Sequence, residues 1–292
     1  LFLLYVITLN ILKNNESRLT RNLFNIIIIF SVGISLYVIF QTIKLGSINQ
    51  WTRVSISSDV DVNHLASFLI PSLLLSLHYA FTKPSKYLLP TILIVTAVFL
   101  TQSRGAIVAI MIALGFYFLM TVNKKNIKFK HIFLTILIMG FVFTVIPEEF
   151  LFRIEQMFTD RTVLMRGSGR NVIWGWAWQE FTNKPIAGIG LGNFSVIYRP
   201  PHSSLFQIIS ELGLLGFSLI SLFVVSLLKY KNNLEDKGIK IEQIVVIALL
   251  AMSLTVDIFY QKYLWIMMGI WSAKKASVSN QNDGAKAVSS IK

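Results

Sequence analysis

The chain has 292 residues, of which 54% are apolar and 14% charged, and a formal net charge of +13. Soluble domains carry closer to a quarter of charged residues, so an ordinary water-soluble fold is excluded. The positive charge does not indicate a nucleic-acid partner, because the Lys and Arg residues lie between apolar runs, as membrane topology requires. The sequence contains no cysteine, which excludes disulfides and thiolate nucleophiles or metal ligands.

Apolar windows predict an all-α fold, a polytopic transmembrane bundle with about nine helices. Their approximate ranges are 1–12, 22–40, 64–82, 87–101, 104–122, 131–147, 203–228, 241–257 and 261–273. The chain opens inside an apolar run that is too short to span a bilayer, so we expect further helices before residue 1. We predict one membrane domain over 1–276 and a disordered tail over 277–292, which is rich in Ser, Asn, Ala and Lys.

The distribution of basic residues predicts which side of the membrane each connector faces. The short connectors near 13–21, 83–86, 123–130 and 229–240 are consistently basic. By the positive-inside rule this side is cytoplasmic, and the C-terminus lies there too. The long loop over 148–202 is then extracytoplasmic, and it carries both acidic and basic residues, so its function must come from individually placed side chains.

Two arginines stand out on the extracytoplasmic side. Arg104 lies between two apolar segments, where an arginine either serves a function such as anion binding or snorkels to the membrane surface and marks a helix end. Arg170 follows Gly167-Ser168-Gly169 and begins a predicted short amphipathic helix, with Trp174, Trp178 and Phe181 on one face at the membrane interface. A guanidinium is suited to bidentate recognition of phosphate oxygens.

His202 follows two prolines at the mouth of a predicted spanning helix, with Ser203 and Ser204 as candidate helix caps. An imidazole that is neutral near pH 7 is suited to removing a proton from a hydroxyl. Glu211 lies inside the same apolar helix, where a carboxylate needs a partner. It either orients His202, if the backbone bends, or pairs with a basic residue of another helix.

Glycines and acidic residues complete the candidate set. Gly188, Gly190 and Gly192 lack the context of a nucleotide-binding loop and predict a tight backbone turn, and Gly213 and Gly216 predict a close-packing face. Asp59-Val60-Asp61 matches a metal–nucleotide motif only weakly, so capping of the next helix by Asp61 or Asn63 is favoured. His64 and His78 are expected to be interfacial and packing residues, and no metal-ligand cluster emerges.

These residues resemble the O-antigen ligase and O-antigen polymerase family of bacterial membrane glycosyltransferases. The resemblance covers roughly residues 60–225 and rests on motifs that follow one another in the family's order. They are Asp61-x-Asn63-His64-x-Ala66, Ser103-Arg104-Gly105, Gly169-Arg170 with Trp174 and Phe181, Pro185-x-x-Gly188-x-Gly190-x-Gly192-Asn193-Phe194, and His202 through Glu211-x-Gly213-x-x-Gly216. The chain departs from the family at Ser203, where an asparagine usually follows the histidine.

The resemblance implies a metal-independent, inverting membrane enzyme of cell-surface polysaccharide and lipopolysaccharide biosynthesis, without a cofactor. Its donor is an undecaprenyl-diphosphate-linked glycan, and its acceptor is a glycan or lipid hydroxyl at the outer face of the bacterial cytoplasmic membrane. Arg104 and Arg170 would hold the diphosphate, and His202 would act as the general base. By the same resemblance, further substrate contacts or shaping of the loop would come from four residues, Gly188, Gly190, Ser203 and Glu211.

Besides a ligase, three functions remain open at this point: a polymerase, a transporter of lipid-linked glycans and a structural membrane subunit. Ligase and polymerase share these motifs, because only the acceptor distinguishes them. A transporter of lipid-linked glycans would bind diphosphate without chemistry, but it predicts ionisable residues along a path through the membrane. A structural membrane subunit would make the set of Arg104, Arg170 and His202 accidental.

Overall fold

The computed structural model describes residues 1–13, 16–45, 54–57, 60–122, 140, 169–229 and 241–274. Every regular element in these ranges is a helix, which confirms the predicted all-helical class for this part of the chain. In chain order the elements are α1 (Phe2–Lys13), α2 (Glu16–Leu45), α3 (Val62–Ala80), α4 (Pro84–Leu100), α5 (Arg104–Val122), α9 (Arg170–Asn183), α10 (Asn193–Ile197), α11 (Ser204–Leu228), α12 (Ile241–Met252), the 3₁₀ turn η2 (Ile258–Tyr260) and a last helix over 262–274.

The predicted apolar windows in the described ranges each overlap an observed helix. The largest difference is α2, which extends beyond its predicted range of 22–40 at both ends. The predicted helix over 131–147, the first part of the predicted loop up to residue 168 and the tail over 277–292 lie outside the described residues.

Two helices are long and apolar enough to cross a membrane, namely α2 over 18–45 and α11 over 204–228. The helices α1, α4, α5 and α12 are apolar but shorter in the described residues. Apolar side chains point outward on both long helices: Ile29 and Ile43 of α2 are 70% and 72% exposed, and Leu219 and Leu222 of α11 are 60% and 67% exposed. Such contiguous apolar surface is suited to hydrocarbon or to a partner rather than to water.

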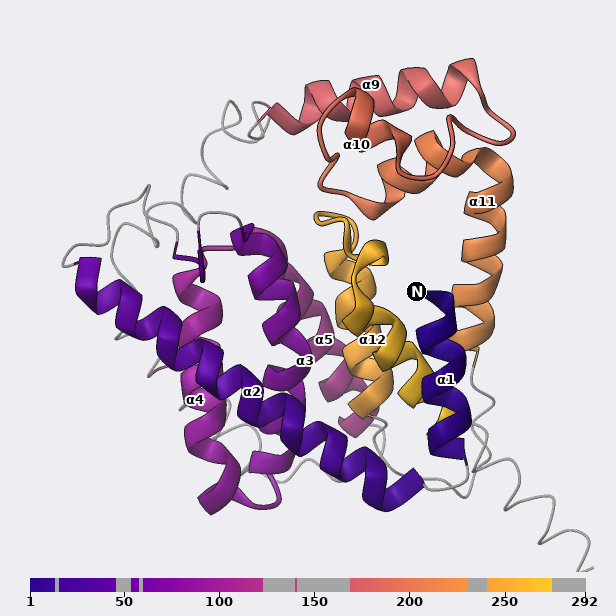
Figure 1. Cartoon of the computed structure of the whole chain (residues 1–292). Helices are drawn as coiled ribbons and strands as arrows, with labels where there is room; N and C mark the ends of the chain where they lie inside the picture. Colours follow the sequence, from indigo (N-terminus) through magenta and orange to yellow (C-terminus); the bar gives the residue numbers. More distant parts are fainter. Residues whose placement is uncertain are drawn as a thin grey trace, which may run out of the picture.

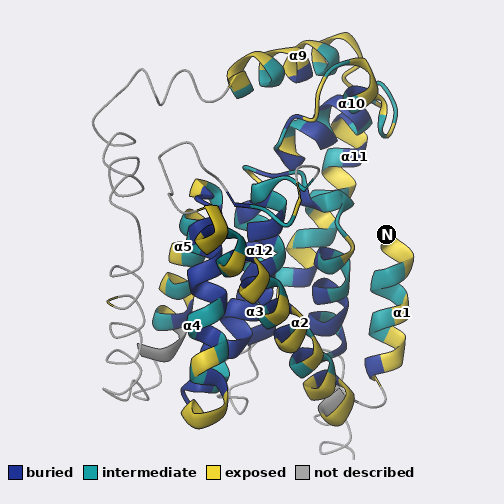
Figure 2. Ribbon diagram, turned by 60° about the vertical axis from the view of Figure 1, so that its left-hand side comes forward, coloured by how far each residue is buried: buried dark blue, intermediate teal, exposed yellow. Residues whose placement is uncertain are grey.

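The core lies around α3, which packs against α2, α4, α5 and α12 (Figure 2 shows it in dark blue). Leu69 and Leu75 of α3 are fully buried. On α5, the buried residues Ala106, Ala109 and Ala113 recur at spacings of three and four and face the neighbouring α12. Small side chains at this spacing let helix backbones approach closely. The bundle therefore holds the starts of α3 and α5 next to the end of α12.

The helices run back and forth, so that their ends fall on two sides of the molecule (Figure 1). We call the side with the starts of α3, α5 and α11 and the end of α12 the upper end. The Ser103 hydroxyl donates to Asn63 Oδ1 at 2.9 Å, which joins α5 to α3. The Ser204 N–H donates to the Ser253 carbonyl at 2.8 Å, which joins α11 to α12.

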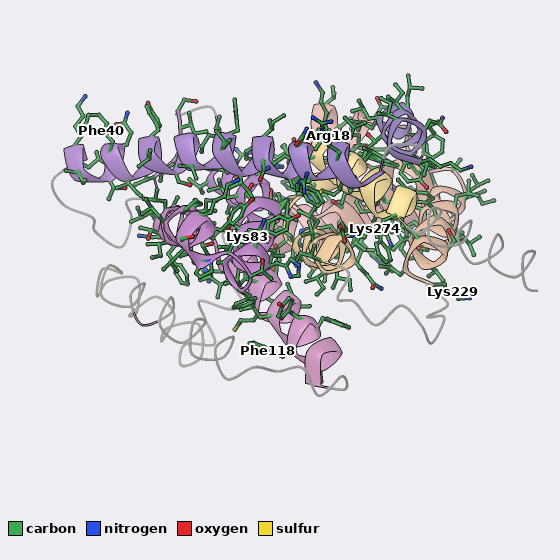
Figure 3. The ribbon with its side chains drawn as sticks, turned by 90° about the horizontal axis from the view of Figure 1, so that it is seen from below. Arg18, Phe40, Lys83, Phe118, Lys229 and Lys274 are labelled. Carbon is green, nitrogen blue, oxygen red and sulfur yellow. The ribbon has the colours of Figure 1, made fainter. Side chains whose placement is uncertain are left out.

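The opposite side is the lower end, where basic residues gather. Arg18 near the start of α2, Lys83 before α4, Lys229 after α11 and Lys274 at the end of the last helix, all labelled in Figure 3, belong to the helix ends on this side of the bundle in Figure 1. Lys274 also forms an ion pair with Glu242, with Nζ and Oε1 2.9 Å apart. Among the described residues, the basic residues of the connectors predicted to be cytoplasmic thus lie at the lower end, opposite the starts of α3, α5 and α11.

The helices α9 and α10 lie across the upper end, above α11 (Figure 1). Trp174 of α9 stacks on Phe206 of α11 with ring centroids 4.8 Å apart, and Ala177 is fully buried beside it. Trp174, Trp178 and Phe181 fall on one side of α9, as their helical spacing predicts, and the Trp178 and Phe181 ring centroids are 5.2 Å apart. Trp178 is 54% exposed, whereas the Trp174 ring is covered by Phe206. The location of this face at a membrane interface stays a prediction.

The helix α11 is broken at Gly213, whose φ of 61° and ψ of −161° are not helical. In an unbroken helix the N–H groups of Leu214 and Leu215 would bond to carbonyls four residues earlier. Here they donate instead to the carbonyls of Pro185 and Ile186, at 2.8 and 3.1 Å. A Cβ at position 213 would lie 2.5 Å from the Ile186 oxygen, so only glycine fits. Gly213 is thus a close-packing residue, as predicted, but it packs against a turn.

The two carbonyls that lose their helical donors are also satisfied by this turn. The Ser210 carbonyl accepts the Ile189 N–H at 3.0 Å, and the Glu211 carbonyl accepts the Gly190 N–H at 2.9 Å. The turn over 185–190 therefore replaces the broken hydrogen bonds of α11 one for one. This exchange satisfies the requirement that buried backbone polar groups be paired, and it fixes the turn to the helix.

Gly188→Ala is expected to destabilise the fold. Gly188 has φ +67°, and a Cβ there would lie 2.4 Å from the backbone carbon of Glu211. The left-handed backbone alone costs about 1–2 kcal/mol for a residue with a Cβ, and the clash adds to it by displacing the turn. The matched control is Gly175→Ala on α9, where the Cβ meets open space, and which should stabilise by about 0.5–1 kcal/mol. Thermal unfolding in detergent should thus move in opposite directions, and equal shifts would contradict the packing described.

Candidate functional site

The upper end begins with Asp61, which caps α3 as the sequence predicts. Its Oδ1 accepts the N–H groups of Asn63 at 2.7 Å and of His64 at 3.3 Å. Burial raises the pKa of this carboxyl, but the two N–H groups and the nearby His202 outweigh that effect and hold the pKa below its ordinary value of 3.8. Asp61 is therefore a fixed negative charge. Asp59 lies outside the described residues.

A tight turn presents Arg104 at the same end. Gln102 has a φ of 52°, which is uncommon for a residue other than glycine. The Ser103 hydroxyl is tied to Asn63, so the turn is anchored on α3. Arg104 follows as the first residue of α5 and is exposed. The guanidinium is thus available to a ligand at the upper end.

His202 also has a left-handed backbone, with a φ of 49°. The Trp174 indole N–H donates to the Pro201 carbonyl at 2.9 Å, so α9 holds the segment that leads into the histidine. Residues forced into sparsely populated backbone regions cost on the order of 1–3 kcal/mol and gather at functional sites. In the described residues, the two such positions other than glycine are Gln102 and His202, and both flank the candidate site.

Asp257 lies between two histidines. Its Oδ1 is 3.2 Å from His64 Nε2 and 3.8 Å from His202 Nδ1. The second distance is too long for a hydrogen bond, and His202 Nδ1 has no hydrogen-bond partner among the described residues. Burial raises the pKa of Asp257, but His64 foremost and then its own backbone N–H and His202 hold it below 3.8. A half-buried carboxylate thus faces the imidazole of His202.

Arg170 begins α9 after Gly169, which has a φ of 77°. Burial lowers the pKa of Arg170; the charge of Asp61 raises it, that of Arg104 lowers it and that of Asp257 raises it again. These interactions place Arg170 within electrostatic reach of Arg104 and of both carboxylates. The structure thereby brings all three predicted catalytic residues, Arg104, Arg170 and His202, to one end of the bundle. Two guanidiniums that repel each other favour an anion between them.

Asp257 is expected to make stability depend on pH in the acid range. Since its folded pKa is lowered, its contribution is fully present above 3.8 and is lost as the pH falls through the folded value. In His64→Gln the burial remains while the main cation is removed, so the folded pKa should rise toward or past 3.8, and the loss of stability with falling pH should become smaller or disappear. Thermal unfolding midpoints across this range test the shift. His78→Gln, whose ring packs against Tyr79 and Tyr117, should keep the wild-type profile, and the same profile in His64→Gln would contradict the pairing.

Glu211 is fully buried, and among the described residues neither of its predicted partners contacts it. Its Oε2 accepts the Gly192 N–H at 2.8 Å and the Tyr260 hydroxyl, in place of His202 or a basic side chain of the described helices. The turn over 185–192 packs against α11 and places the Gly192 N–H next to the Glu211 carboxylate. A backbone donor thereby takes the position that a cation was expected to occupy. Glu211 therefore joins this turn to η2 and shapes the loop.

The serines after His202 differ from their predicted capping role. Ser203 occupies the N-cap position of α11, but its side chain makes no cap hydrogen bond, and its buried Oγ has no partner in the described part of the chain. The Ser204 hydroxyl donates to the Val256 carbonyl at 3.1 Å and accepts the Phe259 N–H at 3.3 Å. Ser204 thus anchors α11 on the segment that carries Asp257.

The glycines form the predicted tight turn. Gly188, Gly190 and Gly192 have φ of 67°, 101° and 81°, in the left-handed region. Their backbone shapes the loop, as described above for α11. No group of three or more His, Asp or Glu side chains in the described ranges is arranged to hold a metal ion.

Comparisons with known proteins add to this geometry. Residues 89–221 match the family model described as O-antigen ligase. A curated protein of Rickettsia conorii, which carries the provisional name polysaccharide ligase, is 29% identical over 147 residues. That match covers 43% of this chain, and the chain spans about a third (35%) of the length of that relative. The region that matches the family model contains Arg104, Arg170 and His202, so the candidate site lies in the part of the chain that is similar to the O-antigen ligase family.

Proposed function

We propose that the chain crosses the cytoplasmic membrane several times, with its upper end outside the cell. The two helices of spanning length, the four shorter apolar helices and the outward-facing apolar side chains support this arrangement. The basic lower end (Figure 3) suits the cytoplasmic side under the positive-inside rule. The site then opens toward the outer leaflet, where a lipid-linked glycan is presented.

We further propose that the protein is a polysaccharide ligase that transfers a glycan from undecaprenyl diphosphate to an acceptor hydroxyl. The observation that carries this proposal is the meeting of Arg104, Arg170 and His202 at one end, with Asp257 beside the histidine. The acceptor oxygen attacks the anomeric carbon, and its proton passes to His202. The bond from that carbon to the diphosphate breaks, and its electron pair leaves with the diphosphate. Attack opposite to the leaving group inverts the anomeric centre.

The two arginines fit the role of holding the leaving group. Negative charge grows on the diphosphate as the bond breaks, and a preorganised cation at that position stabilises the transition state. Arg170 is partly buried and begins a helix above the site, while Arg104 is exposed at the rim. An anionic substrate would relieve the repulsion between them. No metal ion is needed in this scheme, because the guanidiniums supply the positive charge.

Asp257 fits a positioning role for the base. With a proton on Nδ1 facing the carboxylate, Nε2 of His202 keeps its lone pair for the acceptor hydroxyl. The carboxylate also stabilises the imidazolium that forms when the proton is taken up. The 3.8 Å separation of Nδ1 and Oδ1 can shorten when substrate closes the site.

The decisive experiment separates transfer from transport. The chain, purified in detergent, is incubated with an undecaprenyl-diphosphate glycan and either a lipid acceptor or a free glycan chain. A ligase converts the donor to undecaprenyl diphosphate and a glycosylated lipid, and a polymerase instead lengthens the glycan. A transporter only moves the donor between compartments, and detergent removes the compartments, so a transporter would leave the donor unchanged. An unchanged donor would therefore refute the proposed transfer reaction.

A further inference from the structure

The segment over 185–198 has the side chains of a membrane-embedded stretch. It contains no charged residue, and Lys184 and Arg199 bracket it. Ile186, Leu191 and Val196 are 71%, 65% and 83% exposed, which is unusual for aliphatic side chains in a loop surrounded by water. Apolar stretches of about 10–14 residues are too short to span and are typical of re-entrant or interfacial segments.

The hydrogen bonds to α11 set the depth of this segment. The Pro185 and Ile186 carbonyls accept the N–H groups of Leu214 and Leu215. Leu214 lies 14 residues before Leu228, the last residue of α11, which corresponds to about 21 Å at the helical rise. The hydrocarbon core is about 30 Å thick. With Lys229 at the inner surface, Ile186 therefore lies about 9 Å inside the outer edge of the hydrocarbon.

Many backbone polar groups of the segment are paired within the protein, as a hydrocarbon environment favours. The exchange with the broken turn of α11 pairs four of them, as described above. The Gly188 N–H donates to the Lys184 carbonyl at 3.0 Å, and the Gly192 N–H donates to Glu211. The Asn193 side-chain amide donates to the Ile189 carbonyl at 2.7 Å. The segment thus combines this internal pairing with an apolar surface, as suits a lipid environment.

We propose that residues 185–198 form a re-entrant segment that contacts the acyl chains of the outer leaflet beside α11. Lys184 and Arg199 stay at headgroup depth, where anionic phosphates attract them. Leu214 and Leu215 of α11 are 51% and 57% exposed, and their backbone bonds to Pro185 and Ile186 place these apolar residues next to the exposed Ile186. Only part of the predicted loop over 148–202 then lies in water. This inference rests on the membrane arrangement proposed above and not on the transfer reaction.

The absence of cysteine from the chain makes a labelling test direct. Val196→Cys is labelled with an environment-sensitive fluorophore, and the full chain is reconstituted into phosphatidylcholine–phosphatidylglycerol vesicles. Leu219→Cys on α11 is the lipid-facing reference, and Gln179→Cys, exposed on α9, is the water-facing reference. Lipids brominated near the carbonyl end of the acyl chains quench from the outer hydrocarbon, and iodide quenches from water. Circular dichroism checks that each labelled variant keeps its helical content.

The expected result is quenching of the Val196 label by brominated lipid to an extent comparable with Leu219, and little quenching by iodide. Quenching by iodide at the level of Gln179 would overturn the proposal and return the segment to water. Protection from both quenchers would also overturn it, since a protein surface would then cover the segment. No substrate is present, so failed glycan transfer and a failed re-entrant segment are observed separately.

Discussion

Replacement of His202 by alanine is expected to lower the rate of glycan transfer by about 10²–10⁴-fold, the usual contribution of a general base. The loss should fall on turnover and spare donor binding, because in the proposed reaction the imidazole contacts the acceptor hydroxyl and not the diphosphate. Single-turnover transfer, measured beside equilibrium binding of undecaprenyl-diphosphate glycan, gives both quantities. Loss of donor binding with turnover per bound donor unchanged would exclude the base role.

A variant of Asp257, the carboxylate beside His202, is expected to have a smaller effect on transfer than His202→Ala. Asp257→Asn keeps the shape of the side chain but removes the charge that faces His202 Nδ1. We expect a smaller loss of turnover than in His202→Ala and a shift in the pH profile of transfer. A purely structural role for Asp257 would lower stability without moving that profile. His78→Gln, on a ring that packs against aromatic residues, should leave turnover and profile unchanged.

Replacement of Arg170 by alanine is expected to lower transfer by about 10²–10³-fold, the typical loss for one well-placed electrostatic donor. Both donor binding and turnover should fall, because in the proposed reaction the guanidinium contacts the diphosphate before and during its departure. Arg170→Lys should recover only part of the activity, since an ammonium cannot form the bidentate contact. Transfer rates at saturating and limiting donor separate the two effects.

The matched control is Arg18→Ala, the same substitution at the lower end of the bundle (Figure 3). Arg18 is exposed and lies opposite the site, so its loss should leave transfer near the wild-type rate. Equal losses in both variants would indicate a general effect of charge on membrane insertion. The assignment of Arg170 to the diphosphate would then have no support.

The helices of the bundle could be predicted because hydrophobic runs of spanning length reflect a local requirement, the burial of a helix in hydrocarbon. The cap at Asp61 and the turn at Gly188 to Gly192 are local too, and both predictions are confirmed. The common side of Trp174, Trp178 and Phe181 on α9 follows from local helical spacing. The stacking of Trp174 on Phe206 of α11 is a contact between separate elements, which that spacing does not indicate.

Long-range contacts in the site could not be read from the sequence. Asp257 lies beside His64 and His202 only because the bundle brings together segments far apart in the chain, whereas His64 was expected to be an interfacial or packing residue. One signal was available in the sequence: Asp257 ends the apolar window over 241–257, where a carboxylate is costly unless it is paired. Likewise, the partners of Glu211 are a backbone N–H and a tyrosine hydroxyl, and no charge pattern marks them.

The central claim is that the lipid diphosphate binds at the upper end, among Arg104, Arg170 and His202. The most direct measurement uses an undecaprenyl-diphosphate glycan with a photoreactive group next to the diphosphate, crosslinked to the wild-type chain in vesicles. Mass spectrometry of the crosslinked peptides should place the label on segments around residues 101–104, 170, 202 and 257. Crosslinks confined to the lower end, around Lys83, Lys229 and Lys274, would contradict the account.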